Sequence, residues 1–374
     1  MEKMPHILIM SSWYPTKKNP FLGNFVKRHA ELIATKYAVT VLKIDSNSSI
    51  SNISVEKTSQ GNLTEILIEF PHSKNPFINW FRARKAFELG VKNIPQVDLI
   101  HVSNILSDGY QFLWAKKHFK KPMIVTEHGS YYRSEVSSIW SLKERQIIKQ
   151  VLKKADLVTA VSPFLKSEIE RVFPIMMLEI LPNVVDNSIF DFKEKQTSSK
   201  TKFIHISTLD ERFKNVSGII DACEILIKEK QEFELQIISD ESFESWQEIV
   251  NQKGLDKFIG FAGPMNSTEI ALHIQQADAL ILFSNYETFS IVLAEAWSTG
   301  TPVITTPVGI ALNLDKSLGL QVEIQNVQSL VSAMRKFILQ EVHFDGSKIH
   351  AKSVSYHSET VLKQIDKLYT SFLS

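Results

Sequence analysis

Two series of short apolar runs, each run followed by a longer helical stretch, make up most of the chain. The first series comprises 6–10, 38–43, 99–102, 123–126 and 157–161, and the second comprises 203–206, 235–238, 258–261, 279–283 and 302–305. Apolar runs bounded by helices are typical of parallel strands that helices cover on both faces. Two such series predict two doubly wound α/β domains, with ligands at the carboxyl ends of the strands.

The domain boundary is expected where the first series ends. The chain has 374 residues, which is enough for two domains. Residues 182–186 close the first series, and the polar stretch 191–200 indicates a linker. We therefore expect an N-terminal domain at 1–188 and a C-terminal domain at 189–354.

Composition and charge exclude several classes of protein. The formal net charge is +1, so no global basic field favours a nucleic acid, and we expect no such partner. One cysteine, Cys223, cannot make an internal disulfide, and its helical apolar surroundings indicate core packing. No apolar run reaches the roughly 18 residues of a membrane span, and 7–10 is too short for a signal-peptide core. We expect a cytoplasmic protein, with peripheral contact on the inner face of the membrane left open.

The most informative segment is 279–304, which has the pattern strand, loop, helix, strand. Residues 279–283 are strand-like, Ser290 is a suitable N-cap, and 291–299 is expected to form a short helix. Gly300 suits the position just past the helix, and Pro302 follows it. Glu287 then lies in the loop and Glu295 inside the helix. Between them, the backbone N–H groups of 289–292 form an anion site at the helix N-terminus.

This segment resembles the donor site of GT-B glycosyltransferases, in particular the large retaining family 4. The resemblance implies two Rossmann-like doubly wound domains facing across a cleft, with the last helix, 355–374, crossing back onto the first domain. It also implies that Glu287 binds hydroxyls of the transferred sugar and Glu295 the ribose. The backbone of Thr288, Phe289, Ser290 and Ile291 would hold the phosphates. The commonest form of the motif has glycine at 288 and 290, so this chain departs from it. Two solvated glutamates are the alternative interpretation.

Further segments resemble the same family. Gly23 and Asn24 stand in the first strand–loop–helix, where the backbone approaches the donor phosphates and the acceptor; an ordinary turn is the alternative. His128 follows a strand and would line the cleft near the reacting carbon, binding a sugar hydroxyl or taking a proton. A structural histidine remains the alternative there, and His101 is expected to be either cleft-lining or core.

Positive charge for the departing diphosphate is expected from Lys214 and Arg212. Lys214 matches the family's lysine, whereas the usual arginine is replaced by Thr208, and Arg212 is the candidate substitute. A solvated basic pair on a loop is the alternative. No D-x-D stands at a strand end, and no His, Asp and Cys cluster has metal-ligand spacing. We therefore expect no metal and no cofactor, with a UDP-, GDP- or ADP-sugar as substrate.

The sequence thus favours a metal-independent, retaining glycosyltransferase acting in cell-surface polysaccharide or glycoconjugate synthesis. A non-catalytic sugar-nucleotide-binding partner and a GT-B epimerase remain the rival hypotheses. The acceptor is expected to be a glycan or lipid-linked. Residues 74–87 gather four aromatic and four basic residues, which suits an anionic membrane surface. The interpretation that we favour from the sequence is a helix that packs these aromatics on the sheet.

Overall fold

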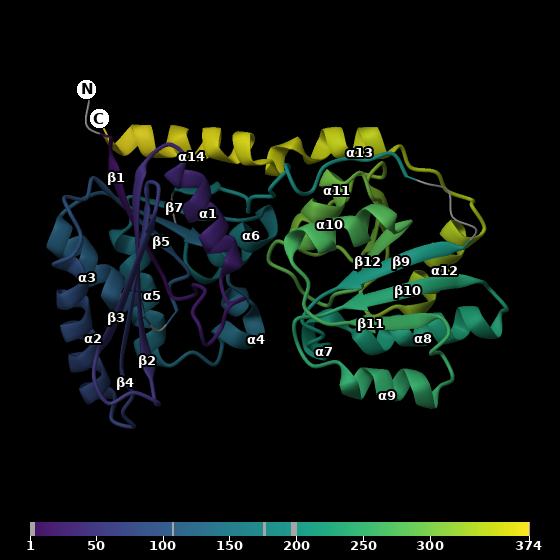
Figure 1. The fold of residues 1–374 in the computed structure, drawn as a ribbon, viewed down its shortest axis with the longest axis horizontal. Coiled ribbons are helices and arrows are strands. Elements are labelled where there is room, and N and C mark those ends of the chain that lie inside the picture. The colour runs from purple at the N-terminus through teal and green to yellow at the C-terminus, as the bar shows by residue number, and fades with distance from the viewer. Residues whose placement is uncertain (1–3, 107, 175–176, 196–199, 374) are drawn as a thin grey trace. The chain divides into compact units, whose positions relative to one another are not determined.

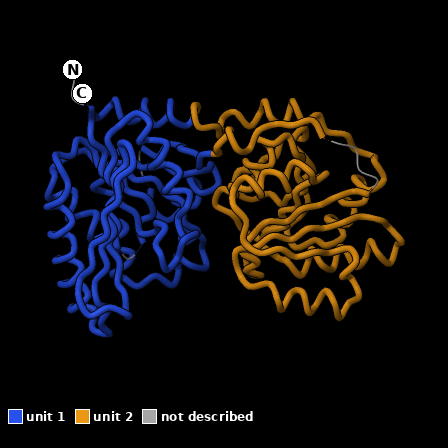
Figure 2. The backbone as a smooth tube through the Cα atoms, viewed as in Figure 1, with its two compact units in different colours: residues 1–184, 361–374 blue, residues 185–360 orange. Residues whose placement is uncertain are grey.

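The computed structural model describes residues 4–106, 108–174, 177–195 and 200–373. The chain forms two compact units, shown in separate colours in Figure 2. Unit 1 comprises Met1–Val184 and Val361–Ser374, and unit 2 comprises Val185–Thr360. The boundaries expected from the sequence are 188/189 and 355. Residues 196–199 of the expected linker lie outside the described residues.

Unit 1 is built on an eight-stranded sheet of order β3-β4-β2-β1-β5-β6-β7-β8 (Figure 1). Its strands are β1 (His6–Ser11), β2 (Ala38–Asn47), β3 (Ser54–Gln60), β4 (Leu63–Pro71), β5 (Leu99–Ser103), β6 (Met123–Glu127), β7 (Leu157–Ala160) and β8 (Leu178–Ile180). All neighbours pair in parallel except β3 and β4. The five expected strands of this series are confirmed. The β3–β4 hairpin was not predicted, because β3 is polar and exposed along its whole length and so carries no hydrophobic pattern.

Helices cover both faces of this sheet. They are α1 (Asn24–Ala34), α2 (Pro76–Val91), α3 (Gly109–Phe119), α4 (Ser134–Ser137), α5 (Leu142–Lys154) and α6 (Pro163–Val172), with a 3-10 turn η1 (Ser130–Tyr132). On one face, α1 packs Val26, Ala30 and Ile33 onto side chains of the strands. The helices α2, α3 and α5 lie on the other face (Figure 1). Each of these helices follows a strand, so its N-terminus lies at the carboxyl edge of the sheet.

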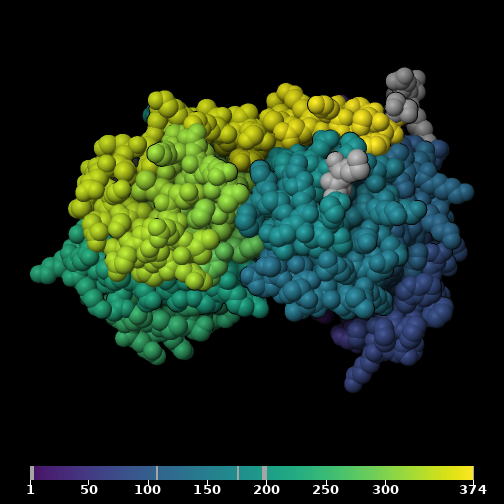
Figure 3. Space-filling view, turned by 180° about the vertical axis from the view of Figure 1, so that it is seen from behind, coloured from purple at the N-terminus to yellow at the C-terminus, as the bar shows by residue number. Residues whose placement is uncertain are grey.

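The last helix, α14 (Ser358–Leu373), completes the core of unit 1. Val361, Ile365 and Tyr369 are fully buried in the cluster that also contains α1 and the strands. The Tyr369 hydroxyl lies 2.6 Å from Nδ1 of His101, and Tyr37 donates to Asp366 at 2.5 Å. Figure 3 shows this helix in yellow on the surface of unit 1. The expectation that the final helix returns to the first domain agrees with these contacts.

Unit 2 has a six-stranded, all-parallel sheet of order β11-β10-β9-β12-β13-β14. Its strands are β9 (Thr201–Ile206), β10 (Phe233–Ile238), β11 (Ile259–Ala262), β12 (Ala279–Leu282), β13 (Val303–Thr305) and β14 (Gly319–Gln321). Its helices are α7 (Glu211–Lys214), α8 (Val216–Lys228), α9 (Glu244–Gln252), α10 (Ser267–Gln276), α11 (Ile291–Ser298), α12 (Val327–Ile338) and α13 (Gly346–Ser353), with 3-10 turns η2 (Gly309–Ala311) and η3 (Val354–Tyr356). Cys223 is fully buried in the core, as expected. The second series of predicted strands is confirmed.

The strand orders fix where ligands can bind. The chain changes direction across the sheet between β1 and β5 in unit 1, and between β9 and β12 in unit 2. In open parallel sheets such switch points leave a crevice at the carboxyl ends of the strands. Ligands are therefore expected at the loops that follow β1 and β5 and at those that follow β9 and β12.

Candidate active site

The switch point of unit 2 brings together Lys214 and Glu287. Lys214 ends α7, just after β9, and Glu287 lies in the loop after β12. Lys214 Nζ lies 2.5 Å from Glu287 Oε1, and the Ser284 hydroxyl donates to the same oxygen at 2.9 Å. The two side chains are only 17% and 11% exposed. Two residues that the sequence assigned separate roles thus form one partly buried ion pair.

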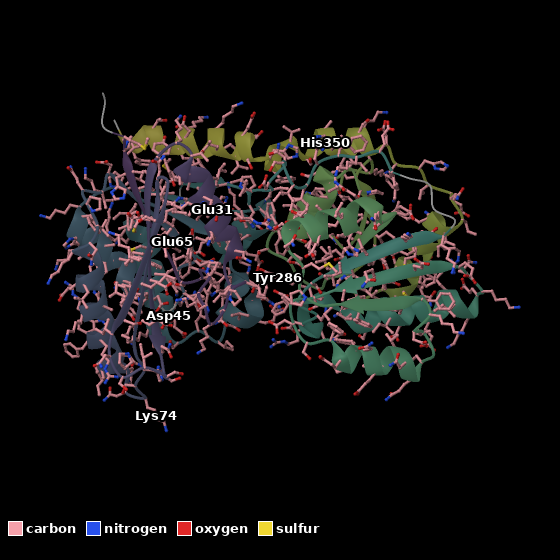
Figure 4. All side chains as sticks on the ribbon, viewed as in Figure 1. Glu31, Asp45, Glu65, Lys74, Tyr286 and His350 are labelled. Carbon is pink, nitrogen blue, oxygen red and sulfur yellow. The ribbon has the colours of Figure 1, made fainter. Side chains whose placement is uncertain are left out.

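The two loops are tied to each other by their backbones as well. The Asn285 N–H donates to the Phe213 carbonyl at 2.7 Å, and the Asn285 side chain donates to the Arg212 carbonyl at 3.2 Å. Tyr286, labelled in Figure 4, lies in the same loop of unit 2. The ion pair is therefore held by a loop contact and does not depend on two free side chains meeting.

The N-terminus of α11 differs from the expectation in one respect. Ser290 occupies the N-cap position, but its φ is 70° and its side chain makes no capping hydrogen bond. The predicted side-chain cap is therefore wrong, because the left-handed backbone turns the hydroxyl away from the N–H groups of the first turn. Among the described residues, the buried Ser290 Oγ has no hydrogen-bond partner. The Ser290 side chain therefore does not occupy the N–H groups at this helix end, which suits the anion site expected there.

The residues around Ser290 form a tightly packed support. Phe289 is buried, with its ring 5.6 Å from that of Tyr356. Its carbonyl accepts from the Ile310 N–H at 3.1 Å, and a Cβ added to Gly309 would lie 2.5 Å from the same oxygen. Gly309 has a φ of 55°, so both conformation and space require glycine there. Thr288 precedes Phe289 in this loop. The contacts of Phe289 and Gly309 therefore support the backbone of the expected phosphate site.

The remaining donor-side residues lie on α11 and α7. Ile291 is the first residue of α11, and Glu295 lies in its second turn, 4% exposed. Arg212 is 80% exposed and bonds Asp210 through two nitrogens, at 3.0 and 2.6 Å. These hydrogen bonds from Arg212 lower the pKa of Asp210 below its ordinary value. Lys214 therefore lies inside the site, whereas Arg212 lies at its surface, paired with a neighbour in sequence.

In unit 1, His128 is buried directly after β6. Its ring stacks on Phe25 with centroids 4.5 Å apart, and the backbone N–H of His128 donates to Asn104 Oδ1 at 3.1 Å. Its Nδ1 lies 2.9 Å from Asn183 Oδ1, and Nε2 has no hydrogen-bond partner among the described residues. Because an amide oxygen only accepts, the ring proton belongs on Nδ1 and Nε2 is an acceptor.

The charge state of His128 follows from its surroundings. Burial, and then His29 and His101 nearby, lower the pKa of His128 well below its ordinary value. The imidazole is therefore neutral at physiological pH. A neutral ring with a free acceptor nitrogen is suited to accepting a hydrogen bond from a hydroxyl group.

Gly23 and Asn24 lie at the start of α1, after β1. Gly23 is the N-cap with a φ of 74°, and an added Cβ would lie 2.5 Å from the Trp13 carbonyl oxygen. The conformation of Gly23 and its packing within unit 1 thus both require glycine at this position. Asn24 is half-buried. His101 is a core residue, since its nitrogens lie 2.6 Å from the Tyr369 hydroxyl and 2.7 Å from that of Thr126.

Two family models match the chain on either side of the unit boundary. The model "Glycosyltransferase Family 4" matches residues 29–188, and "Glycosyl transferases group 1" matches residues 186–353. This chain belongs to the group 1 glycosyltransferases. The matched regions correspond closely to the two units, and the second contains the Lys214–Glu287 pair and α11.

Curated relatives of this group 1 glycosyltransferase are distant. Glycogen synthase of Mycobacterium tuberculosis is 22% identical over 231 residues, covering 59% of this chain and 55% of that protein. N-acetyl-alpha-D-glucosaminyl L-malate synthase of Bacillus anthracis is 24% identical over 242 residues, covering 61% of this chain and 62% of that protein. The aligned part of the chain therefore spans somewhat more than half the length of each relative.

Solved structures agree over nearly the whole chain. Sucrose-phosphate synthase from Thermosynechococcus elongatus superposes with a TM-score of 0.77 at 16% identity and covers 99% of both chains. HepE of Anabaena, solved with UDP, gives a TM-score of 0.74 at 16% identity, covering 98% of this chain and 100% of that one. The group 1 glycosyltransferase therefore has the GT-B fold of two Rossmann-like units.

Sequence reasoning missed several residues around His128. Glu127, Tyr131 and Tyr132 form a buried cluster beside it, and Asn104 binds its backbone. The signal available in the sequence was an acidic residue at the end of an otherwise apolar strand.

Among the described residues, no group of three or more His, Cys, Asp or Glu side chains is placed to hold a metal ion. No helix in the described ranges is long and apolar enough to cross a membrane.

Proposed function

We propose that this protein is a metal-independent, retaining glycosyltransferase that moves a hexosyl group from a nucleoside-diphosphate sugar to a glycan or lipid-linked acceptor. The observation that carries the proposal is the Lys214–Glu287 pair at the unit 2 switch point, beside the uncapped N-terminus of α11. A cation, a carboxylate and free backbone N–H groups are the groups needed for a sugar diphosphate.

Relatives support the choice of donor. Solved structures of Anabaena HepE contain UDP, UDP with glucose, and UDP-glucose. A lipopolysaccharide 1,6-galactosyltransferase of Escherichia coli and an alpha-monoglucosyldiacylglycerol synthase of Streptococcus pneumoniae are among the relatives. These names support a nucleotide-sugar donor and a role in cell-surface polysaccharide or glycoconjugate synthesis.

The proposed roles follow from charge and geometry. Glu295 binds the ribose, and the backbone of 288–291 binds the diphosphate. Lys214, with Arg212 at the surface, stabilises the charge of the departing diphosphate. Glu287 binds a hydroxyl of the transferred sugar, and His128 accepts a hydrogen bond from a hydroxyl through Nε2. Gly23 and Asn24 are assigned to the donor phosphates and acceptor through the start of α1.

Retention is proposed to result from attack on the same face as departure. The acceptor oxygen bonds the anomeric carbon as the bond to the diphosphate oxygen breaks, and the acceptor proton passes to that diphosphate. Catalysis then consists mainly of positioning and charge stabilisation, which need no protein nucleophile. A neutral His128 is consistent with a positioning role and does not require it to carry a proton.

A membrane surface is proposed as the place where a lipid-linked acceptor is met. Large apolar side chains are exposed where three helices of unit 1 begin, at the carboxyl edge of the sheet: Phe21 and Leu22 before α1, Phe77, Ile78, Trp80 and Phe81 on α2, and Ile139 and Leu142 around the start of α5. Of the four aromatics in 74–87, only Phe87 is buried, so the expectation that they pack on the sheet is wrong for the other three.

Basic residues accompany these apolar side chains. Lys74, labelled in Figure 4, lies at an extremity of unit 1 with its side chain pointing outward. Lys85 and Lys143 are also exposed on α2 and α5. Apolar anchors next to lysines suit an anionic lipid surface.

The donor site is tested with Glu295→Ala and Glu287→Ala. A lost charge-assisted hydrogen bond costs about 1.5–3 kcal/mol, so Glu295→Ala should weaken both nucleoside diphosphate and donor by roughly 10- to 150-fold. Glu287→Ala should instead lower kcat by a similar factor, because the sugar loses its near-attack geometry. Diphosphate affinity should not fall in Glu287→Ala, since Lys214 is released from its carboxylate partner.

Calorimetry with the diphosphate and a transfer assay measure both effects. Glu248→Ala, on the exposed surface of α9, is the matched control and should change neither. If both site variants retain wild-type binding and turnover, the donor binds elsewhere. Binding without transfer to any acceptor would favour a non-catalytic partner, and product formed without acceptor would favour an epimerase.

A further inference from the structure

Glu127 is a fully buried carboxyl group at the carboxyl end of β6. The Tyr132 hydroxyl donates to its Oε1 at 2.9 Å, and the Tyr131 hydroxyl donates to its Oε2. The Ile105 N–H donates to Glu127 Oε1 at 3.3 Å and to the Tyr131 oxygen at 3.1 Å. All of these groups point donors at Glu127, which is the arrangement that suits an ionised carboxylate.

These hydrogen bonds connect the loops that carry the site of unit 1. Ile105 belongs to the loop after β5, and Tyr131 and Tyr132 belong to η1, after β6. The neighbouring Asn104 has a φ of 57°, and its side-chain oxygen accepts from the backbone N–H of His128 at 3.1 Å. Glu127 therefore lies between the two segments that fix the position of His128.

The loop after β1 joins the same network. The Ser12 hydroxyl donates to the Ile105 carbonyl at 3.1 Å, and Lys43 Nζ donates to the Ser12 carbonyl at 2.7 Å. The loops after β5 and β6 thus bond the Glu127 carboxylate directly, and the loop after β1 is connected to it through Ile105. Nothing in the transfer mechanism proposed above uses this carboxylate.

We propose that Glu127 is a positioning residue for sugar transfer: its carboxylate locks the loops after β5 and β6 together and thereby fixes the orientation of His128 Nε2. The inference rests on the proposed function, in which His128 binds a hydroxyl of the reacting sugars. Glu127 does not itself touch a substrate in this account.

Protonation of Glu127 would weaken the hydrogen bonds that connect the loops after β5 and β6. Burial raises the pKa of the Glu127 carboxyl to about 7, although the hydrogen bonds from Tyr131, Tyr132 and Ile105 oppose that rise. A protonated carboxyl directs its own O–H at tyrosine hydroxyls that already donate to it, so Tyr131 or Tyr132 must turn its O–H away and the charge assistance of these hydrogen bonds is lost. Turnover should therefore fall as the pH drops below about 7.

Other ionisable groups lie near the hydrogen bonds of Glu127. His29, His101 and His128 are buried, and burial lowers the pKa of each, so they stay neutral. Lys43 pairs with Asp45, and Arg171 donates to the Tyr132 carbonyl at 2.7 Å. Burial raises the pKa of Asp108, which precedes α3, to about 6. The contribution of Asp108 to the pH dependence must therefore be tested separately.

The stability of the fold should respond in the opposite direction to turnover. A carboxyl whose pKa is higher in the folded state contributes stability below its unfolded pKa, and loses it as the pH rises through about 7. Glu127→Gln mimics the protonated form, so at pH 8 it should be no less stable than the wild type. A loss of turnover in this variant is then a loss of positioning and not of folding.

The test compares pH profiles of kcat and KM for the wild type, Glu127→Gln and Tyr132→Phe. Glu127→Gln should lower kcat by about tenfold or more at pH 8, which corresponds to one charge-assisted hydrogen bond. The fall in kcat below about pH 7 should be absent from this variant, and its affinity for the nucleoside diphosphate should be unchanged. Tyr132→Phe should move the fall in kcat to higher pH, because the Tyr132 hydroxyl lowers the pKa of Glu127. Asp108→Asn is the matched control and should leave the midpoint near 7.

A second measurement does not depend on transfer. The His128 ring signals, assigned by their loss in His128→Gln, should shift with a midpoint near pH 7 in wild-type protein and stay fixed in Glu127→Gln. Absence of transfer by the wild type would overturn the proposed function, and the ring signals would still decide the role of Glu127. The inference itself is overturned if Glu127→Gln keeps the fall in kcat below about pH 7 and wild-type kcat, or if the wild-type ring signals do not titrate.

Discussion

Ser290 has a left-handed backbone conformation, which glycine adopts more readily than serine. Its φ of 70° lies in the left-handed region, which costs a residue with a Cβ about 1–2 kcal/mol. The contacts of Phe289 with Tyr356, Gly309 and Ile310 hold the loop in this conformation despite that cost. The strained residue stands at the start of α11, where the diphosphate is proposed to bind.

Ser290→Gly should therefore leave stability unchanged or raise it by up to about 1 kcal/mol, since relief of strain outweighs or offsets the entropy of glycine. Ser290→Val should lower stability by more than about 1 kcal/mol, because a β-branched residue fits this conformation worst. Denaturant unfolding monitored through unit 2 measures both. Equal stability of the glycine and valine variants would contradict the strain.

At the scale of elements, α2 combines two different surfaces. Ala83, Ala86, Phe87 and Val91 are buried and attach the helix to the sheet, whereas Phe77 is 76% exposed at its other end. Asn75 caps the helix by accepting from the Phe77 N–H at 2.9 Å, so the exposed first turn is well formed. A stable helix end with exposed aromatics favours contact with a surface outside unit 1.

The membrane proposal predicts that the full chain floats with vesicles of phosphatidylglycerol and phosphatidylcholine at low salt, and not with phosphatidylcholine alone. Each buried Phe contributes about 1.5–3 kcal/mol when fully transferred, so replacing both Phe77 and Phe81 by serine should weaken binding at least tenfold. Leu272→Ser, which removes an exposed apolar side chain from α10, should have no effect. Equal flotation of all three proteins, or of none, would rule the surface out.

At the scale of the whole molecule, charge is balanced, with 42 basic and 41 acidic residues. A departing diphosphate must therefore be stabilised by local groups, because the protein supplies no long-range positive field. In the proposed mechanism those groups are Lys214, Arg212 and the N-terminus of α11.

If these local groups suffice, transfer should persist in excess chelator, with kcat within about twofold of its untreated value. Lys214→Ala should lower kcat by about tenfold or more in the same assay, because a charged hydrogen bond to the leaving group is lost. Activity that disappears with chelator and returns with magnesium or manganese would show that a metal ion supplies the charge instead.

The sequence by itself determined the two series of parallel strands, the strand–loop–helix context of Glu287 and Glu295, and the position of His128 after β6. These depend on local patterns: apolar runs for strands buried on both faces, and Gly and Pro at the ends of helices. The β3–β4 hairpin was not predicted from the sequence, because the exposed edge strand β3 carries no such pattern.

Tertiary structure alone decided which distant residues meet. Lys214 and Glu287 are 73 residues apart, and the β9–β12 pairing, together with the contact between the loops that follow these strands, brings them together. The backbone of Ser290 is left-handed because Phe289 is anchored by residues after β13, so local propensity for a serine cap did not prevail. Glu127 became a buried acceptor only when the loops after β5 and β6 placed three donors around it. Such contacts depend on strand order, which local sequence patterns do not encode.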